Sequence, residues 1–296
     1  MKKPAKRIRN KVSKTASFTC LSRAVSFFEK KSQYKSNDYI AIKLIPKLFL
    51  FLIKAGWFRK FYKNILAWKG LYEYVIARTK YIDSVFQKAI SNGFIQILIF
   101  GAGFDSRGIR FGRANNNVKI FEMDAPITQN AKIDQFKKRK IDIQSNIIFV
   151  PVDFDNESAE NKLMEYGFKK NKKTLFILEG LLMYLHPESV DNIFELINKF
   201  AGKGSEIVFD YIYSSVIRGE NLYYGESGIL KKIKNTNEPW LFGMEKGEIK
   251  LFLKKWNLKL VENLNSEDLE KRFFTDERGN TVVKINGTHC IVRAKK

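Results

Sequence analysis

The sequence is poor in the residues that build metal and disulfide sites. It contains two cysteines, Cys20 and Cys290, and two histidines, His186 and His289. Two cysteines cannot form a disulfide framework, and this set excludes a structural zinc cluster and an all-histidine metal site. We interpret both cysteines as packing residues, and His186, which precedes a proline at a predicted helix start, as structural.

A long uninterrupted hydrophobic run is also missing. The most apolar stretch, residues 40–61, is broken by Lys43, Pro46, Lys47 and Lys54, which makes a membrane-spanning helix costly and incomplete. We expect an amphipathic or buried helix there, and leave open weak contact with a membrane surface. The basic start of the chain lacks the apolar segment of a signal peptide, so the sequence favours a cytoplasmic protein.

Acidic residues are scarce relative to basic ones. The 296 residues include 53 Lys and Arg against 31 Asp and Glu, a net charge of +22. A hydrophobic content of 45% with 14% aromatics is too high for a disordered basic tail, so the chain folds. Residues 1–35 carry eleven Lys or Arg and one acid. The charge keeps RNA open as a partner, although most of it is interpreted as solvated surface.

The middle of the chain alternates between short apolar runs and helix-length patterns, and a long helix is expected before it at residues 65–90. The apolar runs are residues 95–100, 118–123, 147–152, 174–178 and 206–211, and the helical patterns between them are residues 105–114, 126–140, 157–168 and 187–201. Continuous apolar strands separated by helices are typical of a parallel sheet covered on both faces.

The last third differs from this pattern. Residues 213–243 are rich in glycine and aromatics and predict a loop or lid. A helix at 245–254, a strand at 258–263 and two closing strands at 281–285 and 289–294 are expected after it. We therefore predict one domain, with a helical N-terminal cover (1–92), a core (93–212), a substrate-side lid (213–243) and a C-terminal part (244–296) that completes the sheet.

Two glycines and an acid stand where a nucleotide-binding fold would need them. Gly101 and Gly103 follow the first strand, and Asp124 ends the second strand twenty-one residues later, where such folds bind ribose hydroxyls. Glu122 competes with Asp124 but lies farther from the carboxyl end of the strand. Ser106 replaces the third glycine of a dinucleotide motif, so a ligand with a ribose and no phosphates, S-adenosylmethionine, fits better.

Six ordered segments resemble one known family. They are VSKTA (12–16), YVIARTKYID (74–83), ILIFGAGFDSR (97–107), IFEMDAP (120–126), FVPVDFD (149–155) and LEGLLMYL (178–185). They resemble the successive motifs of the leucine carboxyl methyltransferase-like family, class I S-adenosylmethionine-dependent methyltransferases that include bacterial polyketide-type O-methyltransferases. The resemblance implies a Rossmann-like doubly wound α/β sheet, mostly parallel, with an antiparallel C-terminal strand.

The resemblance also implies how the methionine end of the cofactor is held. Arg78 corresponds to the family's arginine for the cofactor carboxylate, a task that suits a guanidinium fork, and Lys14 matches a lysine that assists it. Glu179 is expected near the methionine end and the methyl acceptor, and Tyr184 in the acceptor pocket, so Arg78, Glu179 and Tyr184 form the expected catalytic set. As alternatives, Arg78 is a solvated helix charge and Lys14 one basic residue among many.

The nucleoside end follows from the same resemblance. Gly101 and Gly103 are expected against the cofactor, and Asp124 at the ribose hydroxyls. Asp153 would accept from the adenine amino group while the backbone N–H of Phe154 donates to the ring. Asp153 has a structural alternative, since aspartate is a common helix cap.

The expected reaction is methyl transfer to an oxygen, carboxylate or hydroxyl, of a small molecule or peptide. An RNA methyltransferase is the first alternative, favoured by the charge and opposed by LEGLLMY, which replaces the Asn/Asp-Pro-Pro-Tyr type of sequence of amino-methylating enzymes. A membrane-surface or other binding protein without catalysis is the second, and it leaves the six motifs unexplained.

Overall fold

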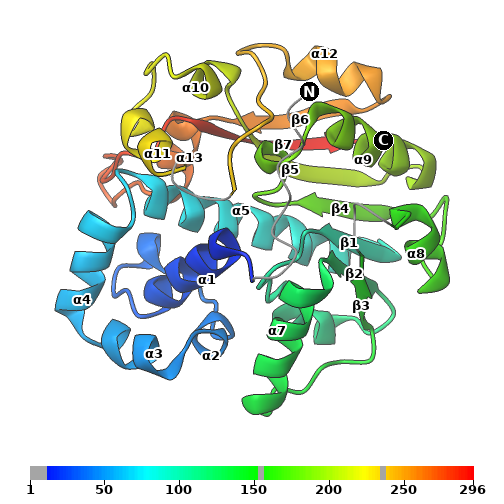
Figure 1. Cartoon of the computed structure of the whole chain (residues 1–296), viewed down its shortest axis with the longest axis horizontal. Helices are drawn as coiled ribbons and strands as arrows, with labels where there is room; N and C mark the ends of the chain where they lie inside the picture. The colour runs from blue at the N-terminus through cyan, green and yellow to red at the C-terminus, as the bar shows by residue number, and fades with distance from the viewer. Residues whose placement is uncertain (1–11, 153–156, 234–237) are drawn as a thin grey trace, which may run out of the picture.

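The computed structural model describes residues 12–152, 157–233 and 238–296. Its centre is a seven-stranded sheet with the order β3-β2-β1-β4-β5-β7-β6 (Figure 1). The strands are β1 (Gln96–Phe100), β2 (Lys119–Asp124), β3 (Ile147–Pro151), β4 (Thr174–Leu178), β5 (Glu206–Ile212), β6 (Lys259–Leu264) and β7 (His289–Lys295). The first five pair in parallel, whereas β7 runs antiparallel to both of its neighbours. The expected Rossmann-like fold with an antiparallel C-terminal strand is confirmed.

The strand predictions agree closely because these strands are buried on both faces. Every residue of β1 and β4 is buried, which explains their continuous apolar runs. The helices between the strands are α6 (Arg107–Phe111), α7 (Pro126–Lys138), α8 (Ala159–Glu165) and α9 (Pro187–Phe200). Short 3-10 turns, η3 (Gly112–Ala114) and η4 (Leu182–Tyr184), follow α6 and β4.

A helical cover precedes the sheet and gathers to one side of it, blue in Figure 1. It consists of α1 (Lys14–Phe27), η1 (Ser32–Tyr34), α2 (Ala41–Leu44), α3 (Lys47–Lys54), α4 (Gly56–Phe61), the π-helical turn η2 (Tyr62–Leu66) and α5 (Leu71–Ser91). The expected helix over 40–61 is wrong, since three short helices replace it. Ile45 and Ala55 have extended backbone angles and separate the three helices. Ile45 precedes Pro46, and a residue before proline prefers this conformation.

The C-terminal third also corrects the sequence reading. It contains α10 (Ser214–Arg218), α11 (Glu226–Ile233), α12 (Ile249–Lys255) and α13 (Ser266–Phe273). The strand expected at 281–285 is wrong: only Thr281 forms a bridge, with Thr275. Both edges of β7 are already occupied by β5 and β6, so this segment bonds elsewhere, with the backbone N–H of Ile285 donating to Glu270. That the chain is one domain stays a prediction.

Candidate functional site

A cavity of about 410 Å³ lies at the carboxyl ends of β1, β2 and β4. The chain proceeds from β1 outward to β3 and then returns to β4 on the other side of β1, and such a switch point is where α/β sheets bind ligands. Residues of α1 and α11 also line the cavity. Thr15 of α1 donates a hydrogen bond to Glu238, beyond α11, so two segments far apart in sequence meet over the pocket.

The turn after β1 forms one wall of the cavity. Gly101 and Gly103 have φ angles of +61° and +48°, a region that favours glycine because it has no Cβ. A Cβ on Gly103 would lie 3.1 Å from the Cβ of Ala16 in α1. The N–H of Gly103 donates to the Asp124 carboxylate, which also accepts from the N–H of Ala125 at 2.6 Å. The turn and the acid are therefore held together.

The competing carboxylate, Glu122, has a different environment. It is 1% exposed, and Lys132 of α7 donates to it at 2.5 Å. It does not line the cavity, whereas Asp124 does. The structure therefore distinguishes Asp124 from Glu122, which the alternation of side chains along the strand could not do.

Arg78 of α5 lines the cavity and is held by two carboxylates, of which Glu179 also lines it and Asp210 lies behind it. Its Nε donates to Oε1 of Glu179 at 3.0 Å, and its Nη1 donates to Oδ2 of Asp210, in β5, at 2.6 Å. Asp210 is fully buried and also accepts from the Tyr74 hydroxyl at 2.9 Å and from the N–H of Gly180 at 2.6 Å. These bonds fix the direction of the guanidinium plane.

Glu179 is shared between two arginines. Its Oε2 accepts from Nη1 of Arg107 at 2.7 Å, while Oε1 accepts from Arg78. Burial alone would raise the pKa of Glu179, but the positive charges of Arg107 and Arg78 outweigh it and lower the pKa to about 2. The carboxylate is therefore ionised at neutral pH and suits binding of a cation better than proton transfer.

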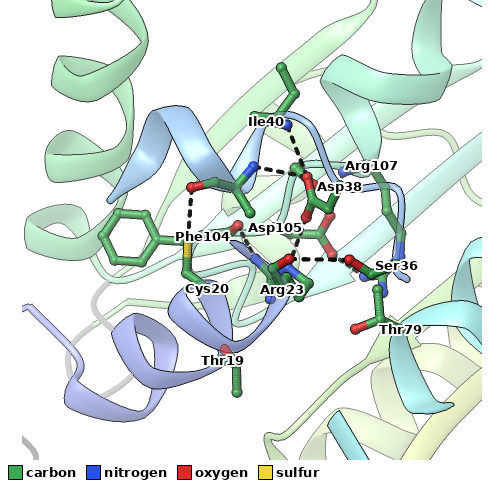
Figure 2. Close-up of polar contacts among 12 residues, drawn as sticks. Thr19, Cys20, Arg23, Ser36, Asp38, Ile40, Thr79, Phe104, Asp105 and Arg107 are labelled. Carbon is green, nitrogen blue, oxygen red and sulfur yellow. Dashed lines mark hydrogen bonds and ion pairs between the residues drawn. The ribbon is translucent and has the colours of Figure 1, made fainter. Parts of the chain in front are cut away.

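A further buried ion pair joins Arg23 and Asp38, whose polar contacts are drawn in Figure 2. Arg23 of α1 donates to Asp38 at 2.9 Å and to the carbonyl of Phe104 at 2.7 Å. The Asp38 carboxylate also accepts from the hydroxyl of Ser106 at 2.8 Å. Burial opposes ionisation, but Arg110 and Arg23 bring the pKa of Asp38 down to about 2. The buried Arg23–Asp38 pair of the helical cover is thus hydrogen-bonded to the turn after β1 through Phe104 and Ser106.

Part of the cavity lining is aromatic, and we call it the aromatic wall. Trp68, Tyr184, Trp240 and His289 form it, and the His289 ring lies 4.4 Å from that of Tyr74 and 5.3 Å from that of Trp240 between centroids. Burial, and then the charge of Arg78, lowers the pKa of His289 to about 3, so the imidazole is neutral. Burial raises the pKa of Tyr184, so the phenol keeps its proton.

Comparison with known proteins assigns the chain to a family. A model of the leucine carboxyl methyltransferase family matches residues 17–198, more than half of the chain. The chain belongs to the leucine carboxyl methyltransferase family. This membership confirms the resemblance read from the six motifs and makes the protein an S-adenosyl-L-methionine-dependent methyltransferase, with S-adenosyl-L-methionine as its cofactor.

Curated relatives carry names that agree with this family. A Bacillus subtilis protein named "Putative S-adenosyl-L-methionine-dependent methyltransferase YktD" is 29% identical over 75% of this chain and 72% of its own. A protein of Mycobacteroides abscessus with a similar name is 30% identical over 49% of this chain and 50% of its own. An O-methyltransferase family protein of Burkholderia thailandensis has a TM-score of 0.49 at 10% identity, over 75% of this chain and 57% of its own; a likeness at that level says nothing about substrates.

The structure brings most of the predicted site residues of this family member to one pocket. The residues of that set which line it are Lys14, Arg78, Gly101, Gly103, Asp124, Glu179 and Tyr184. Asp153 and Phe154 lie outside the described residues. Their individual roles stay predictions.

Sequence reasoning missed Asp210 and Arg107. Asp210 had a usable signal, because a carboxylate inside the apolar run EIVFDYI is as unfavourable without a partner as Glu179 after TLFIL. Among the described residues, no cluster of three potential metal ligands occurs, and no helix is long and apolar enough to cross a bilayer.

Proposed function

We propose that the protein methylates an oxygen, that of a carboxylate in preference to a hydroxyl, on an apolar small molecule or peptide. The aromatic wall of the pocket carries this proposal. Two titratable groups on it, Tyr184 and His289, are a protonated phenol and an imidazole with a pKa of about 3, and neither takes a proton from an alcohol near neutral pH. A carboxylate is already a nucleophile and needs no general base.

The cofactor fits the polar residues that line the cavity. A cavity of about 410 Å³ is within the range of roughly 300–1,000 Å³ usual for small-ligand sites, and a Cβ on Gly101 or Gly103 would lie 3.1 Å from Leu181 or Ala16, which also line it. We assign Asp124 to the ribose hydroxyls, Arg78 with Lys14 to the methionine carboxylate, and Glu179 to the ammonium group. Ionised Glu179, with its low pKa, suits that last task.

The contribution of the protein is alignment. S-adenosyl-L-methionine supplies a methyl group already activated on a sulfonium, so the chain has to hold donor and acceptor in line and exclude water. Asp210 and Glu179 orient Arg78 through the bonds described above. The aromatic wall packs the apolar body of the acceptor, and the Tyr184 hydroxyl, which keeps its proton, donates a hydrogen bond to the acceptor oxygen.

Calorimetric titration with S-adenosylhomocysteine tests the binding assignments. Asp124→Asn is expected to weaken binding at least tenfold, about 1.4 kcal/mol, because it removes a charged acceptor from the ribose. Asp142→Asn, the same change in an exposed pair with Arg113, is the matched control and leaves the affinity unchanged. Equal affinities of the two variants would remove Asp124 from the site.

Alkaline treatment of labelled product tests the acceptor. Protein incubated with methyl-labelled S-adenosyl-L-methionine and a panel of aromatic and aliphatic acids and alcohols should yield products that release volatile methanol in alkali, as methyl esters do. An alkali-stable ether would replace carboxylate by hydroxyl as the preferred acceptor. Label in bulk tRNA, bound in a steeply salt-dependent way, would favour the RNA alternative and overturn the proposal.

A further inference from the structure

The helical cover carries large apolar side chains that face solvent. Phe51 and Leu48 of α3 are 75% and 68% exposed, and Trp57 of α4 is 69% exposed. Phe49 of α3, Phe61 of α4 and Ile65 of the adjoining turn η2 are also exposed, at 37%, 40% and 63%. We call these six side chains the α3–α4 surface.

Two buried side chains and one arginine hold α3 and α4 in place. Of α3 only Ile53 is fully buried, and of α4 only Phe58. Nη1 of Arg59 donates to the carbonyls of Ile53 and Lys54 at 2.8 and 2.9 Å, which satisfies the end of α3 and fixes its angle to α4. The exposed side chains are therefore presented by a held pair of helices at the outer edge of the molecule (Figure 1).

The charge around the α3–α4 surface has one sign. No acidic residue occurs from residue 39 to residue 72, a segment with seven Lys or Arg. Lys43, Lys47, Lys54 and Lys60 are exposed around the apolar side chains. Apolar and aromatic side chains beside lysines, on short helices, are typical of segments that lie in the headgroup region of a membrane, and clustered lysines near a bilayer are attracted by anionic lipids.

We propose that the α3–α4 surface binds the face of a lipid bilayer that contains anionic lipids. Phe51, Leu48 and Trp57 enter the boundary between headgroups and acyl chains, and the lysines lie at the phosphates. The helices are too short to span a bilayer, so the contact is peripheral. This proposal does not depend on the acceptor, because binding to vesicles can be measured without methyl transfer.

Co-sedimentation of the whole protein with vesicles tests the proposal. Vesicles of phosphatidylcholine with phosphatidylglycerol should bind the protein, and pure phosphatidylcholine vesicles should bind it much more weakly. The double variant Leu48→Ser with Phe51→Ser should lose at least tenfold in partition coefficient. Leu251→Ser, at a 70% exposed leucine of α12 on the other side of the molecule, should bind as the wild type does.

Charge reversal separates this surface from general attraction of a basic protein. Lys47→Glu with Lys54→Glu should weaken binding to anionic vesicles more than Lys250→Glu with Lys254→Glu, the same charge change on exposed lysines at α12. Equal losses from the two pairs would overturn the proposal, because binding would then follow net charge alone.

Quenching of tryptophan fluorescence by lipid reports insertion of a side chain into the bilayer, which electrostatic attraction alone would not produce. Trp57 is the exposed tryptophan, whereas Trp240 and Trp256 are buried and Trp68 is half-buried. Brominated lipids should quench the wild type on binding, and Trp57→Phe should keep binding but lose most of the quenching. Unchanged quenching in Trp57→Phe, or a dimer that Leu48→Ser with Phe51→Ser abolishes without lipid, would overturn the proposal.

Discussion

Replacing Asp210 by asparagine tests the buried charge network on the pocket wall. One Asp210 oxygen accepts from the N–H of Gly180, and the other accepts from Arg78 and the Tyr74 hydroxyl. An asparagine of the same shape has one acceptor and one donor group. If its oxygen stays with Arg78, its NH₂ faces the N–H of Gly180, and the reverse orientation leaves Nη1 of Arg78 and the Tyr74 hydroxyl without this acceptor. Either way at least one buried donor has no acceptor.

The expected loss in the free energy of unfolding follows from the number of buried donors left without an acceptor. A buried unsatisfied donor costs about 1–3 kcal/mol, and loss of a charge-assisted bond adds to it; removal of one partner from a buried ion pair costs about 3–5 kcal/mol. Because Arg78 keeps Glu179 as a partner, we expect Asp210→Asn to lower the free energy of unfolding by about 3 kcal/mol, at the lower end of that range. Displacement of Gly180 should also weaken binding of S-adenosylhomocysteine.

Urea unfolding followed by circular dichroism, with calorimetric titration of S-adenosylhomocysteine, measures both effects. Asp191→Asn is the matched control, since Asp191 pairs with Lys255 at 2.8 Å on the surface with both side chains about half exposed. Surface pairs contribute only about 0–1 kcal/mol. If Asp210→Asn unfolds at the same urea concentration as Asp191→Asn and binds as the wild type does, Asp210 does not organise the site.

Three further predictions concern pH, the glycine turn and the thiols. The pKa of Asp38 is about 2 in the folded chain, below its ordinary 3.8, so ionised Asp38 stabilises the fold above pH 4 and this contribution is lost toward pH 2. Between pH 5 and pH 2, the free energy of unfolding of the wild type in urea should fall by about 2 kcal/mol more than that of Asp38→Asn. Gly103→Ala should lower stability and S-adenosylhomocysteine affinity, whereas Gly93→Ala, with positive φ but open space, should lower stability alone; equal affinities would contradict this. Buried Cys20 and Cys290 should not react with an aromatic disulfide reagent until urea unfolds the chain, and fast native labelling would refute their burial.

Periodicity located the sheet because its strands satisfy a simple physical condition. Residues buried on both faces are mostly apolar. Every residue of β1 and β4 is buried, and only the first residue of each strand, Gln96 and Thr174, is polar. The same criterion failed at 281–285, because TVVKI has strand composition but both edges of β7, the strand that follows it, are taken by β5 and β6. Pairing partners are a tertiary property that local composition does not record.

Local signals for helices were present and partly unused. The start of α13 carries a capping box between Asn265 and Asp268, which the sequence displays as N-S-E-D. Pro46 and Gly56 likewise separate α3 from its neighbours. Hydrophobic periodicity alone predicted one helix over residues 40–61, because each of the short helices there is shorter than the window in which a period becomes visible.

For the site, motif spacing predicted which residues meet but not how they are bonded. Arg78 was expected to bind a ligand directly, and the structure shows that two protein carboxylates already hold it. Asp210 enters the site from β5, which lies outside the quoted segments, and Arg107 ends a quoted segment in which it had no assigned role. Such a network depends on side-chain directions across four elements, which only the folded chain defines.

The hydrogen bond from Thr15 to Glu238 has a consequence for turnover. It joins α1 to a segment more than two hundred residues later, and both residues line the pocket. Breaking this bond would let the two segments separate and widen the pocket, so we expect each catalytic cycle to include one opening and one closing. Such motions occur on the microsecond to millisecond scale and commonly limit kcat through product release. Thr15→Val, which removes the donor, would then raise kcat if opening is the slow step.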